Sequence, residues 1–138
     1  MDQKIKIALE ILDDEIKGDV KNALQKMHED YSMTWVYKNK KGILFPYITS
    51  ENIKSELNEV YNFPERKYDI KNVCSSEKCV IIEMIESYYD PEDKKTYRTP
   101  QIIVLEYKDN KIRTGRHYCD PQISYLNLSE ETLNKIYK

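Results

Sequence analysis

The most regular part of the sequence is residues 78–120, KCVIIEMIESYYDPEDKKTYRTPQIIVLEYKDNKIRTGRHYCD, in which long extended runs alternate with short polar segments. The extended runs are rich in Val, Ile, Leu, Thr and Tyr, residue types that are typical of β-strands. They are Lys78–Tyr89, Lys95–Lys108 and Lys111–Asp120, and a similar run, Arg66–Cys74, precedes them. The sequence therefore predicts four long consecutive strands.

Three short links with the composition of turns join these strands: Ser75–Glu77, Asp90–Asp93 and Asp109-Asn110. The last is a candidate two-residue hairpin loop, because Asp and Asn tolerate positive φ angles. Links this short require antiparallel neighbours, so the strands are predicted to form a meander. Across the first turn, Cys74 and Cys79 are expected to face one another.

The segment before the meander is mainly helical. Residues 4–17 predict an amphipathic helix because apolar side chains recur at spacings of three and four residues. The predicted stripe is Ile5, Ala8, Leu9, Leu12 and Ile16. Gly18 suits the position after a helix, and Asp19 suits the N-cap of a second helix. A strand over 32–37 and a third helix starting at residue 49 or 50 follow, so the fold class is α+β.

Composition limits the classes of function. The 138 residues are expected to form one domain, 1–138, with a formal net charge of −2, which does not indicate a nucleic-acid surface. No apolar run of about 18 residues is present and the first residues are charged, so a cytoplasmic protein without a membrane partner is predicted. With three Gly and two His, neither a glycine-rich phosphate loop nor a His-rich metal site is expected, and no cofactor is predicted.

The turns also predict the register of the meander. With Asp109-Asn110 as a loop, Ile102 faces His117, and with Asp90–Asp93 as a loop, Glu86 faces Tyr97. The face predicted to receive the helices, the inner face, then carries Val80, Ile82, Met84, Glu86, Tyr88, Tyr97, Thr99, Gln101, Ile103, Leu105, Tyr107, Thr114, Arg116, Tyr118 and Asp120. One end of this face is polar, which predicts a cleft. A slip of one residue would exchange the two faces of a strand.

The opposite, outer face carries His117 and Cys119 in this register. It also carries an aliphatic patch formed by Ile81, Ile85, Ile102 and Val104. Because such a patch is unfavourable in water, a partner surface is expected to cover it.

The chain resembles the SnoaL-like branch of the nuclear transport factor 2-like (NTF2-like) superfamily. The resemblance lies in Tyr31-Ser32-Met33-Thr34-Trp35, in the helix after Thr49, and in Asp109–Ile112 followed by Arg116–Asp120. It implies a cone-shaped barrel, with a strongly curved, mainly antiparallel sheet wrapped around N-terminal helices and a deep pocket for a small hydrophobic or aromatic metabolite. It also implies a homodimer through the outer face. Members include polyketide cyclases, ketosteroid isomerases and epoxide hydrolases.

In cyclase-like members an aspartate of the last strand is the general acid/base, and the matching residue is Asp120. Tyr118 and Tyr97 are the candidate hydrogen-bond donors to a developing enolate oxygen. The candidate ligand-binding residues are Trp35, Met84, Glu86, Thr99, Gln101 and Arg116. Alternatively, Asp120 caps the chain before Pro121, and His117 enters the pocket if its strand slips by one residue.

Two functions follow, and the sequence leaves both open. One is a cofactor-independent isomerase or cyclase that uses Asp120 as general acid/base. The other is a non-catalytic module that binds a ligand or partner on the same scaffold. Burial of Asp120 would favour the enzyme, and exposure of Asp120 would favour the binding module.

Overall fold

The computed structural model describes residues 2–61 and 63–138, without the side chains of residues 60 and 61. The helices are α1 (Gln3–Lys17), α2 (Val20–Gln25), α3 (Ile53–Tyr61), α4 (Pro121–Ser124) and α5 (Glu130–Asn134), and a 3₁₀ turn, Lys135–Tyr137, follows α5. The strands are β1 (Met27–Trp35), β2 (Tyr47–Thr49), β3 (Lys67–Ser75), β4 (Cys79–Asp90), β5 (Lys95–Lys108) and β6 (Lys111–Tyr118). The four predicted long strands are confirmed within one or two residues at each end.

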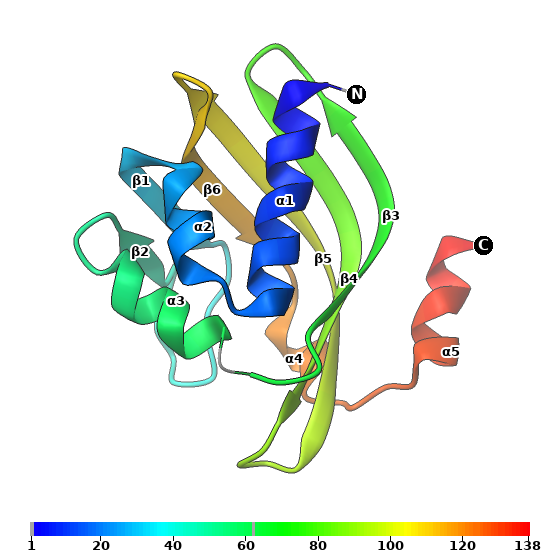
Figure 1. Ribbon diagram of the computed structural model, residues 1–138. Coiled ribbons are helices and arrows are strands. Elements are labelled where there is room, and N and C mark those ends of the chain that lie inside the picture. The colour runs from blue at the N-terminus through cyan, green and yellow to red at the C-terminus, as the bar shows by residue number, and fades with distance from the viewer. Residues whose placement is uncertain (1, 62) are drawn as a thin grey trace.

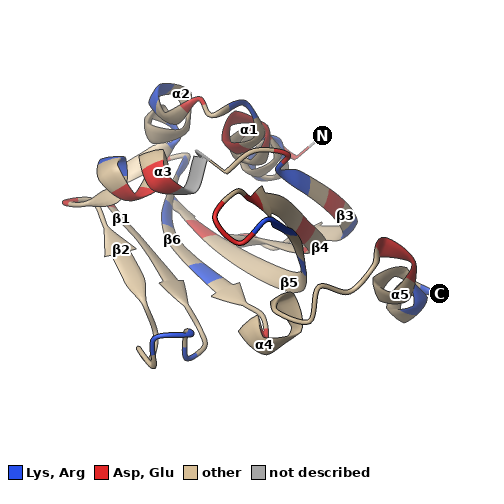
Figure 2. Ribbon diagram, turned by 90° about the horizontal axis from the view of Figure 1, so that it is seen from below, with Lys and Arg blue, Asp and Glu red and all other residues tan. Residues whose placement is uncertain are grey.

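The strands form a single six-stranded sheet in the order β2-β1-β6-β5-β4-β3. The predicted meander β3 to β6 is antiparallel, whereas β1 pairs with β6 in parallel. The sheet curves around α1, α2 and α3, which cover its inner face (Figure 1; Figure 2 shows the same curvature from below). This confirms the α+β class and the mainly antiparallel sheet around N-terminal helices, although the sheet does not close into a barrel.

The boundary between α1 and α2 forms as predicted, at Gly18 and Asp19. Asp2, which is not among the predicted caps, begins α1, and its carboxylate accepts a hydrogen bond from the backbone N–H of Lys4 at 2.7 Å. Gly18 ends α1 with a φ of 71°. Asp19 then caps α2 by accepting from the backbone N–H of Asn22.

The buried face of α1 differs from the predicted stripe. The buried apolar residues are Ile7, Ala8, Ile11 and Leu12, whereas Ile16 is 48% exposed. Apolar residues occur around more than half of this helix, so their spacing alone does not determine which side faces the sheet. As a consequence, Glu15 is turned towards the sheet.

The β4–β5 turn begins one residue later than predicted. Asp90, predicted to lie in the loop, pairs with Lys95, and its carboxylate accepts from the backbone N–H of Glu92 at 2.9 Å. Glu86 therefore faces Thr99 instead of Tyr97. Because the shift is two residues, the side chains of both strands keep their predicted faces.

The register between β5 and β6 differs by one residue from the prediction. The Asp109-Asn110 turn is confirmed, with φ angles of 53° and 62°. A β-bulge then lies between Glu106 and Tyr107, so His117 pairs with Ile103 instead of Ile102. One extra residue exchanges the faces of a strand. His117 and Cys119 therefore lie on the inner side and line a cavity, whereas Tyr118 is 40% exposed.

The predicted pairing of Cys74 with Cys79 is wrong. Cys74 pairs with Ile81, and Cys79 lies beside Ser76, with 3.3 Å between Sγ and Oγ. β3 continues to Ser75 and β4 begins only at Cys79, so the turn lies one residue later in the sequence than predicted and the two cysteines are out of register.

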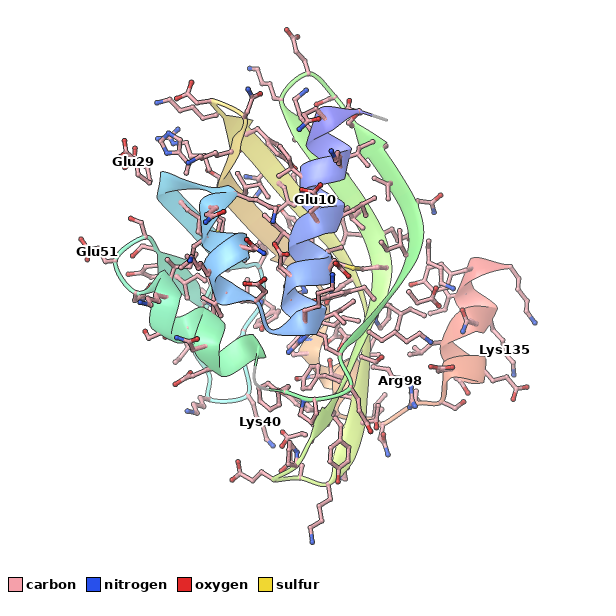
Figure 3. All side chains as sticks on the ribbon, in the orientation of Figure 1. Glu10, Glu29, Lys40, Glu51, Arg98 and Lys135 are labelled. Atoms are coloured by element: carbon pink, nitrogen blue, oxygen red, sulfur yellow. The ribbon has the colours of Figure 1, made fainter. Side chains whose placement is uncertain are left out.

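The C-terminal segment lies on the outer side of the sheet. The Arg98 guanidinium donates to the backbone carbonyl of Leu128 at 3.1 Å, and the Lys71 ammonium donates to the Asn134 side chain at 2.6 Å (Figure 3 shows Arg98 between the strands and this segment). Within the predicted outer patch, Ile85 is buried, while Ile81 and Ile102 are 37% and 40% exposed. Among the described residues, no helix is long and apolar enough to cross a membrane.

Adjacent isoleucines on β4 test the assignment of the two faces. Ile82 is fully buried on the inner face, and Ile81 is partly exposed on the outer face. Ile82→Ala is expected to lower the free energy of unfolding by about 2–5 kcal/mol, because it leaves a cavity in the core. Ile81→Ala, the matched control, should lower the free energy of unfolding clearly less in the same urea titration. Equal losses would contradict the assignment of Ile82 to the inner face and Ile81 to the outer face.

Candidate functional site

A cavity of about 270 Å³ lies between the inner face of the sheet and the helices. Its inner end is apolar and is formed by side chains such as Ile11 and Leu12 of α1, Ile82 of β4, Ile103 of β5 and Ile112 of β6. These side chains are almost completely buried. The volume is close to the lower end of the roughly 300–1,000 Å³ typical of small-molecule pockets.

An ionic cluster lies on the wall of this cavity. The Arg66 guanidinium is 2.6 Å from the Glu86 carboxylate and 3.6 Å from that of Glu15 (Nη1 to Oε2 and to Oε1). All three side chains are at most 16% exposed. Tyr68 of β3 also interacts with Glu15. Glu15 of α1, Arg66 directly before β3 and Glu86 of β4 therefore bring one cation and two carboxyl groups together.

The two carboxyl groups differ in their surroundings. Burial, and next the nearby charge of Glu86, raise the pKa of Glu15 to about 7. The single guanidinium of Arg66 is closest to Glu86, so the cluster has least net charge when Glu15 keeps its proton. A carboxyl group with such a pKa can both donate and accept a proton near neutral pH.

His117 and Gln101 form a second polar pair on the cavity wall. The His117 Nε2 and Gln101 Oε1 atoms are 2.5 Å apart. Burial lowers the pKa of His117, so its imidazole is neutral at neutral pH and Nε2–H donates to the amide oxygen. Among the described residues, the buried Gln101 Nε2 has no hydrogen-bond partner. It is therefore a donor available to a molecule in the cavity.

Aromatic side chains surround the outer end of the cavity. Phe63 and Tyr88 contact one another at 5.1 Å between ring centroids, and Tyr125 is 43% exposed although it lines the cavity. Tyr37 and Trp35 line it as well. Because the inner end is closed by buried residues, we place the mouth of the cavity at this aromatic end.

Four of the predicted ligand-binding residues lie on the cavity wall. They are Trp35, Glu86, Thr99 and Gln101. Thr99 forms a hydrogen bond with Ser124 of α4, a short helix that was not predicted.

The remaining predicted site residues do not line the cavity. Asp120 is exposed and caps α4, where its carboxylate accepts from the backbone N–H of Gln122 at 2.9 Å. Tyr118 points outwards because of the β-bulge, and Arg116 pairs with Glu106 at 3.2 Å.

Two further predicted residues are buried elsewhere. The Tyr97 hydroxyl donates to Asp93 at 2.5 Å, which raises the pKa of Tyr97 to about 12. Met84 is completely buried in the core of the protein.

Glu15 and Arg66 are not among the predicted site residues. Glu15 follows Ala8, Ile11 and Leu12 at spacings of seven, four and three residues, so it is a charged residue on the stripe that is actually buried. That pattern could have identified it. Arg66 precedes β3 directly, and no local pattern marks it as buried.

No family model matches the sequence, and no curated protein matches it. Among solved structures, a candidate SnoaL-like polyketide cyclase from Shewanella putrefaciens superposes with a TM-score of 0.76 at 13% identity, covering 92% of this chain and 96% of that one. The chain has the NTF2-like fold. A candidate isomerase from Bacillus subtilis has a similar structure, with a TM-score of 0.75 at 16% identity, covering 91% of this chain and 94% of that one. An LEH-like epoxide hydrolase from M. tuberculosis is also similar (TM-score 0.73, 15% identity, 97% and 95% covered).

The raised pKa of Glu15 predicts a specific pH dependence of stability. In the unfolded chain a glutamate has a pKa of about 4.3. Between this pH and about pH 7, the folded protein therefore binds more protons than the unfolded chain. The contribution of Glu15 is therefore complete below the lower value and is lost as the pH rises through 7. In Glu15→Gln, the fall in unfolding free energy from about pH 5 to about pH 8 should be smaller by about 2 kcal/mol.

The exposed Glu10 of the same helix provides the control for this measurement. Urea titrations of Glu10→Gln at both pH values should reproduce the wild-type slope. A Glu15→Gln protein with the full wild-type slope would show that Glu15 titrates normally.

Proposed function

We propose that the protein binds a small, uncharged, mainly apolar or aromatic molecule in the cavity and transfers a proton at a carbon next to a carbonyl group. This is a cofactor-independent isomerase or cyclase reaction. The observation that carries the proposal is the buried cluster of Glu15, Arg66 and Glu86, in which the pKa of Glu15 is about 7. A carboxylate and a carboxylic acid in one apolar cavity are the groups that such a reaction needs.

The roles follow from the charges. Glu86, paired with Arg66, accepts the proton from the substrate carbon, and protonated Glu15 returns a proton to a second atom of the same molecule. Proton loss and gain balance, and Glu15 is re-protonated from Glu86 or water. The free N–H of Gln101 donates to the carbonyl oxygen while it carries negative charge. Glu86 faces Thr99, so Gln101 lies diagonally across the strand pair, about 7–8 Å away between Cα atoms.

Deuterium exchange tests this reaction without knowledge of the natural substrate. Acetophenone and related aryl ketones are incubated with the protein in D₂O, and loss of the α-proton signal is followed by NMR. Glu86→Gln and Glu15→Gln are each expected to lower the exchange rate by roughly 10²–10⁴-fold, the usual contribution of a general acid or base.

Asp120→Asn is the matched comparison, because Asp120 is the acid/base that the sequence predicted and lies exposed outside the cavity wall. If Asp120→Asn abolishes exchange while Glu86→Gln retains it, the assignment to the ionic cluster is wrong. In that case the original prediction for Asp120 holds.

The alternative is a module that binds a ligand without catalysis. The exposure of Asp120 favours this reading. So does the engagement of Arg66 with both carboxyl groups, which is also a way to stabilise a buried charge. Binding of an aryl ketone, seen as quenching of Trp35 fluorescence, without any α-proton exchange would support the binding module.

Homodimerisation through the outer face is part of the proposal. Ile81 and Ile102 are exposed on adjacent strands of this face, and the C-terminal segment lies nearby. Ile102→Asp would place an unpaired charge in such an interface, and sedimentation velocity should then show a monomer. Ile16→Asp, at an exposed position of α1, should not alter the sedimentation. A wild-type protein that is monomeric at high concentration would contradict the dimer.

A further inference from the structure

The loop between β1 and β2 exposes a group of large apolar side chains at one end of the molecule. Ile43, Leu44 and Phe45 of the loop are 53%, 62% and 50% exposed, and Tyr47, the first residue of β2, is 67% exposed. Single exposed apolar residues are ordinary, but a contiguous group marks an interaction site. We call these four residues the apolar loop tip.

Hydrogen bonds fix the loop, so the tip cannot simply fold back. The Asn39 side chain accepts from the backbone N–H groups of Lys41 and Ile43 at 3.0 and 2.9 Å. The backbone N–H of Phe45 donates to the carbonyl of Tyr37 at 2.9 Å, while Phe45 has a φ of 52°. This φ is unfavourable for an aromatic residue. The chain therefore tolerates local strain in a conformation that presents apolar side chains to solvent.

Three exposed lysines lie in the same loop as the apolar loop tip. Lys38, Lys40 and Lys41 are exposed, and residues 31–50 contain no Asp or Glu, although the whole chain has a net charge of −2. Figure 2 shows this loop in blue, without red. A surface that is complementary to this loop must therefore combine apolar groups with negative charge.

The tip lies beside the mouth of the cavity. Tyr37, at the start of the loop, lines the cavity. The Lys40 ammonium is 5.2 Å from the ring centroid of Tyr125, which directly follows α4 and also lines the cavity (Figure 3 labels Lys40 in the lower left part of the molecule). Leu126, the next residue, is 63% exposed. A surface that covers the tip therefore approaches the entrance of the cavity.

We propose that the apolar loop tip and its three lysines dock the protein on a membrane surface rich in anionic lipids, from which the cavity receives its apolar ligand. Leu, Ile and Phe side chains enter the boundary between headgroups and acyl chains, while lysines remain at the headgroups. A second copy of the chain fits less well, because a two-fold interface would bring the same lysines together. This inference revises the expectation of no membrane partner, which considered only spanning segments.

Vesicle sedimentation tests the docking, and it requires no turnover. Vesicles of phosphatidylcholine and phosphatidylserine in a ratio of about 7:3 should sediment the wild-type protein, and pure phosphatidylcholine vesicles should sediment much less. Ile43→Ser with Leu44→Ser should weaken partitioning at least about tenfold. Replacing Lys38, Lys40 and Lys41 by Gln should weaken it on the order of a hundredfold, roughly fivefold for each lysine.

The matched control replaces Lys78, Lys108 and Lys111 by Gln, with the same change of charge at the β3–β4 and β5–β6 turns. These turns lie at the other end of the sheet from α4 (Figure 1), so partitioning of this variant should stay close to that of the wild-type protein. Circular dichroism should show all variants folded, because the replaced side chains are exposed.

Three results would overturn the proposal. The first is a wild-type protein that does not sediment with the anionic vesicles. The second is a control variant whose partitioning to the vesicles is weakened as much as that of the loop variants. The third is self-association without vesicles that the Ile43→Ser, Leu44→Ser variant abolishes, because this would identify a second copy as the occupant.

Discussion

The β-bulge near the β5–β6 turn determines which side chains form the cavity wall. Glu106 pairs with Thr114 and Tyr107 with Ile112, so β6 contains one more residue than β5 over this interval. From that point on, every side chain of β6 points to the face opposite to the one that regular pairing would give. The place of His117 beside Gln101, the outward direction of Tyr118 and the position of α4 all depend on this one residue.

The strands and helix ends could be predicted because their signals are local. Asp109 and Asn110 tolerate the positive φ angles of a two-residue turn, and Gly18 and Asp19 mark helix ends by their own chemistry. The bulge could not be predicted, since the residues around Arg113 carry no local mark of an extra position. Likewise, the orientation of α1 depends on packing against the sheet, so the predicted apolar stripe gave no indication that Glu15 lies in the cavity wall.

The candidate site combines two opposing electrostatic requirements. An apolar cavity disfavours charge, yet Arg66 remains charged and must be balanced by a carboxylate. Because two carboxyl groups share one guanidinium, one of them retains a proton near neutral pH. The cluster has one guanidinium for two carboxyl groups, which makes its burial costly for folding. For the same reason it contains a titratable group suited to proton transfer.

The parallel pairing of β1 with β6 has a consequence for how the chain acquires its structure. Trp35 lies beside His117, although more than half of the chain separates them, and β2 is attached to the sheet only through β1. During synthesis, β1, and β2 with it, therefore cannot join the rest of the sheet until β6 has left the ribosome. Contacts this distant in sequence slow folding and prolong the exposure of strand edges. The β1–β2 pair is thus expected to be the last part of the sheet to be covered by native contacts while the protein is being made.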